Sequence, residues 1–160
     1  MSLKLAFTSL VLALAPFTAQ AFCFDEAAAR YLPDPSGNYQ ASSLLLMAIA
    51  KTESNMNPRA RAGNKNGTVD IGLMQINSVH LPKLAQYGIS EAALQNDACT
   101  SVQVGAWVLA QCIATHGNNW RAVGCYNTGS KGADSVRQIY VQKVKGNLDA
   151  LAQKNHVQIF

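Results

Sequence analysis

The stretch Leu44–Ala60, LLLMAIAKTESNMNPRA, is an apolar segment that ends with a carboxylate, Glu53. Leu46, Ile49 and Glu53 follow the i, i+3, i+7 spacing that aligns side chains on one face of a helix. We therefore expect Glu53 on the apolar face of a helix over 43–54, near its C-terminus. Burial and the negative end of the helix dipole would raise the pKa of Glu53, as a proton donor near neutral pH requires. The alternative is that Glu53 reaches water at a frayed helix end.

Helical spacing of apolar residues continues through most of the chain, so the sequence predicts a compact all-α domain with almost no strand. Helices are expected over 25–32, 43–54, 73–78, 91–95, 101–116, 120–126 and 134–152. Turn sequences such as PDPSGN and THGNN separate them. Asn66-Gly67 could turn a hairpin, but the flanking residues alternate poorly, and a loop is expected there.

Residues 1–21 have the pattern of a secretory signal: Lys4, an apolar run, and TAQA at the end. The apolar run is too short for a permanent membrane anchor. Cleavage after Ala21 would remove 21 of the 160 residues and leave 139, the size of one domain. Phe22 stands where a lipobox requires Gly or Ala, so we do not expect a lipid on Cys23.

The four cysteines of the chain, Cys23, Cys99, Cys112 and Cys125, all follow the expected cleavage site. An even number in an exported protein indicates two disulfides, with three connectivities open. The net charge is +4, and the basic residues are scattered without the dense run that nucleic-acid binding needs. His80, His116 and His156 are isolated, so neither a metal site nor a cofactor is expected.

Three short motifs follow Glu53 in a fixed order: ES at Glu53-Ser54, GLMQIN at Gly72–Asn77, and CYNTGS at Cys125–Ser130. The ordered set resembles the soluble lytic transglycosylases, whose catalytic domain has a goose-type lysozyme-like fold within the α+β lysozyme-like superfamily. NPRA, DIGLMQIN and VGAW resemble the single-domain branch that accompanies type IV and type III secretion, conjugation and pilus machines. The resemblance implies a catalytic domain over 22–152, between the signal peptide (1–21) and a C-terminal tail (153–160).

The resemblance also assigns roles to individual residues. It makes Glu53 the catalytic acid and Ser54 its hydrogen-bonding neighbour, and it places a tyrosine hydroxyl, that of Tyr140, facing the glutamate. The substrate groove would be formed by Gln75 and Asn77 as polar groups, Met74 as an apolar wall, and Tyr126 with Asn127 on the opposite side. As alternatives, Met74 and Tyr126 could fill the core, and Gln75 and Asn77 could cap a short helix.

Cys112 and Cys125 flank the THGNN connection at similar heights of an antiparallel helix pair, which favours a bond between them. Cys125 replaces the small residue usual in the family, so this disulfide is expected beside the groove. The resemblance supports the second pairing, Cys23 with Cys99.

The implied activity is non-hydrolytic cleavage of the MurNAc-GlcNAc β-1,4 bond of peptidoglycan, which leaves 1,6-anhydroMurNAc ends. Glycoside hydrolysis normally needs two carboxylates, and only Asp70 lies near the predicted groove, where a turn-capping or solvated role is favoured. A lysozyme-type hydrolase that uses Asp70 and a non-catalytic peptidoglycan-binding scaffold remain as alternatives. We expect a periplasmic monomer that binds glycan strands and serves an envelope machine, without nucleic acid or a stable membrane anchor.

Overall fold

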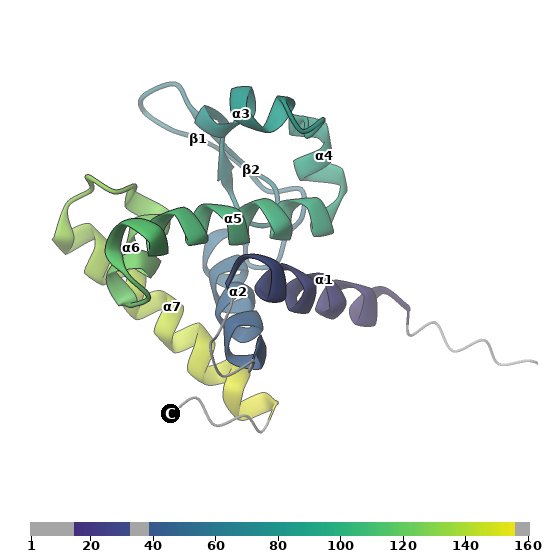
Figure 1. The fold of residues 1–160 in the computed structure, drawn as a ribbon, viewed down its shortest axis with the longest axis vertical. Helices are drawn as coiled ribbons and strands as arrows, with labels where there is room; N and C mark the ends of the chain where they lie inside the picture. Colours follow the sequence, from purple (N-terminus) through teal and green to yellow (C-terminus); the bar gives the residue numbers. More distant parts are fainter. Residues whose placement is uncertain (1–14, 33–38, 156–160) are drawn as a thin grey trace, which may run out of the picture.

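The computed structural model describes residues 15–32 and 39–155, which form helices and one small sheet (Figure 1). The helices are α1 (Ala15–Tyr31), α2 (Tyr39–Ser54), α3 (Leu81–Ala85), α4 (Glu91–Asn96), α5 (Ala98–His116), α6 (Trp120–Thr128) and α7 (Asp134–Lys154). The strands are β1 (Arg61–Gly63), β2 (Val69–Ile71) and β3 (Ile76–Asn77), followed by a 3₁₀ turn, η1 (Ser78–His80). A mainly helical fold with minimal strand is thus confirmed.

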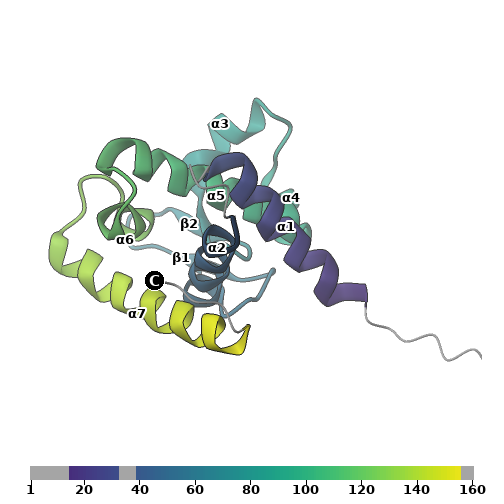
Figure 2. The same cartoon turned by 60° about the horizontal axis from the view of Figure 1, so that its bottom comes forward.

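Helix α2 lies in the middle of the helical part, with α1, α5 and α7 around it (Figure 2). Its side chains Leu46 and Ile49 are fully buried, as the periodicity of the sequence predicts. Because the same face continues to Glu53, core packing also fixes the direction of that carboxylate. In Figure 1, α3 and α4 lie above α5, whereas α2 and α7 extend below it.

Helix α5 is long and apolar enough to cross a membrane, judged by length and composition alone. Its apolar residues Val102, Val104 and Leu109 are buried, and the helix packs against α1, α4 and α6. A helix that packs in the core of a protein can meet the same length and composition criterion, and α5 packs in this way.

The segment around Asn66-Gly67 forms a hairpin, which corrects the expectation of a loop. Strands β1 and β2 are antiparallel, with Arg61 opposite Ile71 and Gly63 opposite Val69, and β3 adds on the other side of β2. The burial pattern of β1 is exposed throughout, so alternation could not have indicated it. Hydrogen bonds within the connecting loop define this turn instead.

The expected helix over 73–78 is wrong. Gly72 and Gln75 have φ values of +75° and +48°, which break any helix, and the chain continues as β3 and η1. The tight turn also lets the amide of Met74 donate to Ser101 Oγ at 3.1 Å. Helix α3, which follows η1, was not predicted.

Other helix boundaries also differ from those expected. Helix α1 begins at Ala15 instead of residue 25 and includes the expected cleavage position after Ala21. Helix α2 begins four residues early, α5 three residues early, and both α6 and α7 end two residues late. His156 and most of the expected C-terminal tail lie outside the described residues.

Both expected disulfides are confirmed. Cys23 on α1 bonds to Cys99 at the start of α5, with their Cα atoms 5.2 Å apart. Cys112 on α5 bonds to Cys125 on α6, with a Cα separation of 5.8 Å. Two disulfides indicate an oxidising compartment, as expected of an exported protein.

Candidate active site

A groove of about 870 Å³ opens beside the end of α2. Its walls come from the β1–β2 hairpin and the segment 75–80 on one side, and from α5 and the end of α6 on the other. Glu53, at the C-terminal end of α2, is one of its lining residues. The sequence motifs that are far apart in the chain therefore meet at one cavity.

Glu53 is partly buried, and loss of solvent raises the pKa of its carboxyl from 4.5 to about 7. The hydrogen bond from Tyr140 opposes this rise, and the negative charge of Asp70 adds to it. At neutral pH the side chain is consequently divided between acid and carboxylate. Such a group can both donate and accept a proton during one reaction.

Tyr140 on α7 donates its hydroxyl hydrogen to Glu53 Oε1, with an oxygen-to-oxygen distance of 2.6 Å. The tyrosine is buried, and burial together with the nearby Glu53 charge raises the pKa of its hydroxyl well above 10. Tyr140 therefore stays protonated and remains a donor. A second polar contact joins the same helices: Asn147 Nδ2 of α7 donates to Oγ1 of Thr52, the residue before Glu53 on α2, at 2.9 Å.

Two hydroxyls hold the backbone beneath the groove. Ser54 Oγ donates to the carbonyl of Leu73 at 2.7 Å, and Tyr126 Oη donates to the carbonyl of Met74 at 2.8 Å. Ser54 thus binds the backbone of the neighbouring turn, and none of its described hydrogen bonds reaches Glu53, the partner that the resemblance suggested. Tyr126 does line the groove, opposite the hairpin.

The side chain of Met74 does not form an apolar wall of the groove. It is fully buried and lies against Gly105 of α5, where an added Cβ would collide with the methionine. Met74 therefore fills the core, which was the alternative interpretation of the sequence. Its role at the site is to present a backbone carbonyl to Tyr126.

Gln75, Asn77 and Asn127 all line the groove. Gln75 Nε2 donates to the carbonyl of Gly72 at 2.8 Å, which supports the left-handed backbone at Gln75. Asn77 Oδ1 caps η1, and its amide donates to Asp70 Oδ1 at 2.7 Å. Gln75 and Asn77 therefore both stabilise the local structure and line the groove.

Asp70 on β2 is a half-buried residue of the groove wall. Asn64 donates to its Oδ2 at 2.9 Å and Asn77 to its Oδ1 at 2.7 Å. Two amides thus satisfy a charged carboxylate without a cation, and they tie the hairpin to β3. The sequence did not indicate the contribution of Asn64, since Asn in a loop carries no specific signal.

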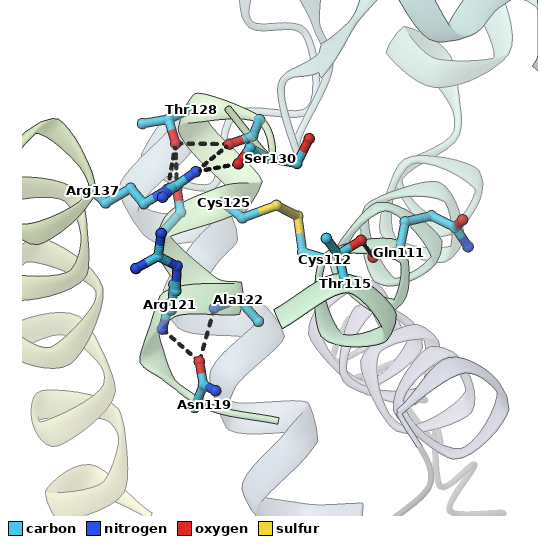
Figure 3. Close-up of a disulfide and its surroundings, with 12 residues drawn as sticks. Gln111, Cys112, Thr115, Asn119, Arg121, Ala122, Cys125, Thr128, Ser130 and Arg137 are labelled. Atoms are coloured by element: carbon cyan, nitrogen blue, oxygen red, sulfur yellow. Dashed lines mark hydrogen bonds between the residues drawn. A yellow bond between two sulfur atoms is a disulfide. The ribbon is translucent and has the colours of Figure 1, made fainter. Parts of the chain in front are cut away.

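The wall on the α6 side is held by a disulfide and a buried arginine (Figure 3). Cys112 and Cys125 line the groove and join its two helices. Arg137 of α7, only 4% exposed, donates to the carbonyls of Gly129 and Ser130 at 3.0 and 2.7 Å and to Thr128 Oγ1 at 3.2 Å. Sequence reasoning missed Arg137, because a lone arginine on a helix usually faces solvent.

Within the described part of the chain, no cluster of three or more His, Cys, Asp or Glu side chains could hold a metal ion. His80 lines the groove and makes an edge contact with the ring of Trp107, with centroids 5.6 Å apart. Burial lowers the pKa of His80, which favours the neutral imidazole.

The sequence profile of the transglycosylase SLT domain matches residues 30–147. The chain belongs to this family. It is similar to invasion protein IagB of Salmonella typhimurium, with 44% identity over 110 residues that cover 68% of this chain and 69% of IagB. Protein IpgF of Shigella flexneri is 38% identical over 124 residues, 78% of this chain and 76% of IpgF. The X polypeptide of Escherichia coli is 36% identical over 116 residues, 72% of this chain and 64% of that protein.

As an SLT-domain protein, the chain is a lytic transglycosylase whose substrate is peptidoglycan. This membership disfavours the non-catalytic scaffold. The groove, with one acid of raised pKa among polar side chains, is then the candidate active site.

Proposed function

We propose that the protein cleaves the MurNAc-GlcNAc β-1,4 bond without water and leaves 1,6-anhydroMurNAc ends. One observation carries the proposal: Glu53, with its pKa raised to about 7 by burial, faces a groove and accepts a hydrogen bond from Tyr140 on only one of its oxygens. A single group that can act first as acid and then as base is what this reaction requires.

In the first step, protonated Glu53 gives its proton to the glycosidic oxygen. Because Oε1 is engaged by Tyr140, we assign the acidic proton to Oε2. The bond between C1 and the glycosidic oxygen breaks, and the electron pair leaves with that oxygen. The 2-acetamido oxygen of the sugar supports the positive charge at C1.

In the second step, the Glu53 carboxylate takes the proton of the C6 hydroxyl, and O6 forms a bond to C1 as the acetamido oxygen withdraws. Glu53 is protonated again, and no water is consumed. The nucleophile belongs to the same sugar, so proximity replaces the water that a second carboxylate would otherwise activate. The Tyr140 hydrogen bond stabilises the carboxylate between the two steps.

A hydrolase is the second candidate, because Asp70 lines the same groove and its charge contributes to the raised pKa of Glu53. Asp70 would then hold a water or stabilise C1. Its two oxygens already accept amide hydrogens from Asn64 and Asn77, which favours a role in fixing the hairpin.

Product analysis in ¹⁸O-labelled water separates the two reactions. Purified peptidoglycan is digested with the protein, and the released muropeptides are weighed. Unlabelled products, lighter by one water than the hydrolysed forms, support the transglycosylase. Labelled reducing ends would show the hydrolase instead.

We further propose that the protein is exported, that cleavage after Ala21 gives a mature chain starting at Phe22, and that it opens the wall locally for an envelope machine. The disulfides and the name of the invasion protein that it resembles support this setting. N-terminal sequencing and the intact mass of the exported protein test the cleavage. A mature chain that starts at Cys23 with an added lipid would contradict it.

A further inference from the structure

The tip of the β1–β2 hairpin presents a lysine, Lys65, at the rim of the groove. Lys65 lines the groove and its side chain is exposed. Among the described groove residues, only Lys65 and His80 have basic side chains, and burial favours the neutral form of His80. Lys65 therefore supplies the positive charge of this groove at neutral pH.

The hairpin tip is held rigidly by hydrogen bonds on both sides of Lys65. The amide of Asn64 donates to the carbonyl of Thr68 at 2.8 Å, and its side chain donates to Thr68 Oγ1 at 3.1 Å and Asp70 Oδ2 at 2.9 Å. Asn66 Oδ1 accepts from both the amide and the hydroxyl of Thr68, at 3.1 and 2.8 Å. Because these hydrogen bonds already hold the backbone at Lys65, less conformational entropy is lost when Lys65 binds a ligand.

Within residues 15–32 and 39–155, no ion pair involves Lys65. The ion pairs in the described part of the chain join other residues, such as Arg61 with Glu91 and Arg137 with Asp134. Asp70, five positions away, is already bound by the amides of Asn64 and Asn77. The ammonium group at the groove rim is therefore left to bind an anionic part of the substrate.

In peptidoglycan the acetylated sugars are uncharged, whereas the peptide stems carry free carboxylates. A stem leaves every second sugar, so stems must emerge from the groove at its rim. We propose that Lys65 binds a carboxylate of a peptide stem, and that the protein thereby favours peptide-bearing glycan over peptide-free glycan. This inference rests on the proposed function, because it takes the groove to be the glycan site.

The test compares Lys65→Ala, Lys65→Glu and wild type on two substrates. The first is intact glycan strands; the second is stripped strands, from which an amidase has removed the stems and in which the lactyl carboxylates thereby freed have been converted to amides. Exposed ion pairs are weak, so on intact strands we expect Lys65→Ala to lower kcat/KM about threefold. Charge reversal should lower it about tenfold, and the loss should shrink as salt is added. On stripped strands all three proteins should act equally. Lys143→Ala, an exposed site on α7 outside the groove, is the matched control and should match wild type on both.

Binding provides a readout that does not depend on the reaction. In a Glu53→Gln background, cosedimentation with intact sacculi should be strongest with Lys65, weaker with Lys65→Ala and weakest with Lys65→Glu. Binding to stripped strands should not change. Equal losses on both substrates, or no loss on either, would overturn the role of Lys65. If wild type releases no anhydro products but binding still follows the charge at position 65, the proposed reaction fails and the stem contact stands.

Discussion

Tyr140 and Glu53 lie 87 positions apart in the chain, and the tyrosine hydroxyl donates to Glu53 Oε1 at 2.6 Å. The bond crosses the interface between α2 and α7, where Asn147 and Thr52 make a second polar contact. Packing of these two helices therefore positions the acid as well as burying it. Each nearby charge or donor then shifts the pKa of Glu53 in a direction that can be measured.

Replacing Glu53 by Gln keeps the shape of the side chain and removes the exchangeable proton. We expect activity on peptidoglycan to fall at least about a hundredfold, the lower range for the loss of a general acid or base. Initial rates of muropeptide release measure this loss. An active Glu53→Gln protein would show that another residue donates the proton.

The same substitution should stabilise the fold at neutral pH. The folded pKa of about 7 lies above the ordinary 4.5, so the folded state holds its proton more tightly than the unfolded state between these values. Stability is therefore lost as pH rises from 4.5 to 7, by an amount on the order of 2–3 kcal/mol. Glu53→Gln lacks this loss, so its Tm advantage over wild type should appear above pH 4.5 and be complete near pH 7.

Tyr140→Phe should shift the alkaline limb of the kcat/KM profile to higher pH. The hydrogen bond lowers the pKa of Glu53, so removing it leaves burial and the Asp70 charge to raise this pKa further above 7. Because the first step needs the protonated acid, the decline of kcat/KM on the alkaline side should shift to higher pH. The carboxylate formed in the reaction also loses a donor, so the maximum rate should fall about tenfold. An unshifted alkaline limb would mean that Tyr140 does not act on Glu53.

Asp70→Asn should move the same limb in the opposite direction. Removing the negative charge lowers the pKa of Glu53, and the decline should begin at lower pH. As a transglycosylase, the variant should keep far more activity than Glu53→Gln and still release unlabelled anhydro products. A loss as large as that of Glu53→Gln would favour the hydrolase, in which Asp70 acts on water.

The sequence predicted those parts of the site that depend on local spacing. Helical periodicity placed Glu53 on the buried face of α2, and the THGNN connection placed Cys112 beside Cys125. The segment 73–78 was misassigned because its apolar residues have helical spacing, while the tertiary contacts of Gly72 and Met74 impose a turn. Met74 was likewise misplaced, since Gly105, some thirty residues later, leaves the space that the Met74 side chain fills.

The hairpin and the α6 wall could not be predicted, because they depend on side chains that hold backbone. The strand residues Arg61–Gly63 are all exposed, and the register is set by Asn64 and Thr68 in the loop. Arg137 looks like an ordinary charged residue of an exposed helix until the Thr128–Ser130 segment folds onto it. Neither arrangement leaves a periodic pattern in the sequence.

The disulfide between Cys112 and Cys125 should matter for binding as well as for stability. Replacing both cysteines by serine removes the cross-link between positions with a sequence separation of 13. The free energy of unfolding should fall by about 3 kcal/mol. Both residues line the groove, so KM should rise even at temperatures where the variant is folded. Thermal unfolding and steady-state kinetics at low temperature measure the two effects. An unchanged KM would show that the helix ends keep their positions without the bond.

Substitution of Arg137 should change the shape of the groove without changing proton transfer by Glu53. Its guanidinium holds Thr128, Gly129 and Ser130, all of which line the groove, while Tyr140, one turn further along α7, holds Glu53. Arg137→Met leaves two carbonyls without their donor, so we expect a loss of about 1–3 kcal/mol in stability. KM should rise because the wall is no longer fixed, whereas the alkaline limb set by Glu53 should stay where it is. Arg137→Lys keeps the charge but cannot reproduce the fork of donors, so it should recover only part of the binding. A displaced pH limb in either variant would show that the wall and the acid are coupled through α7.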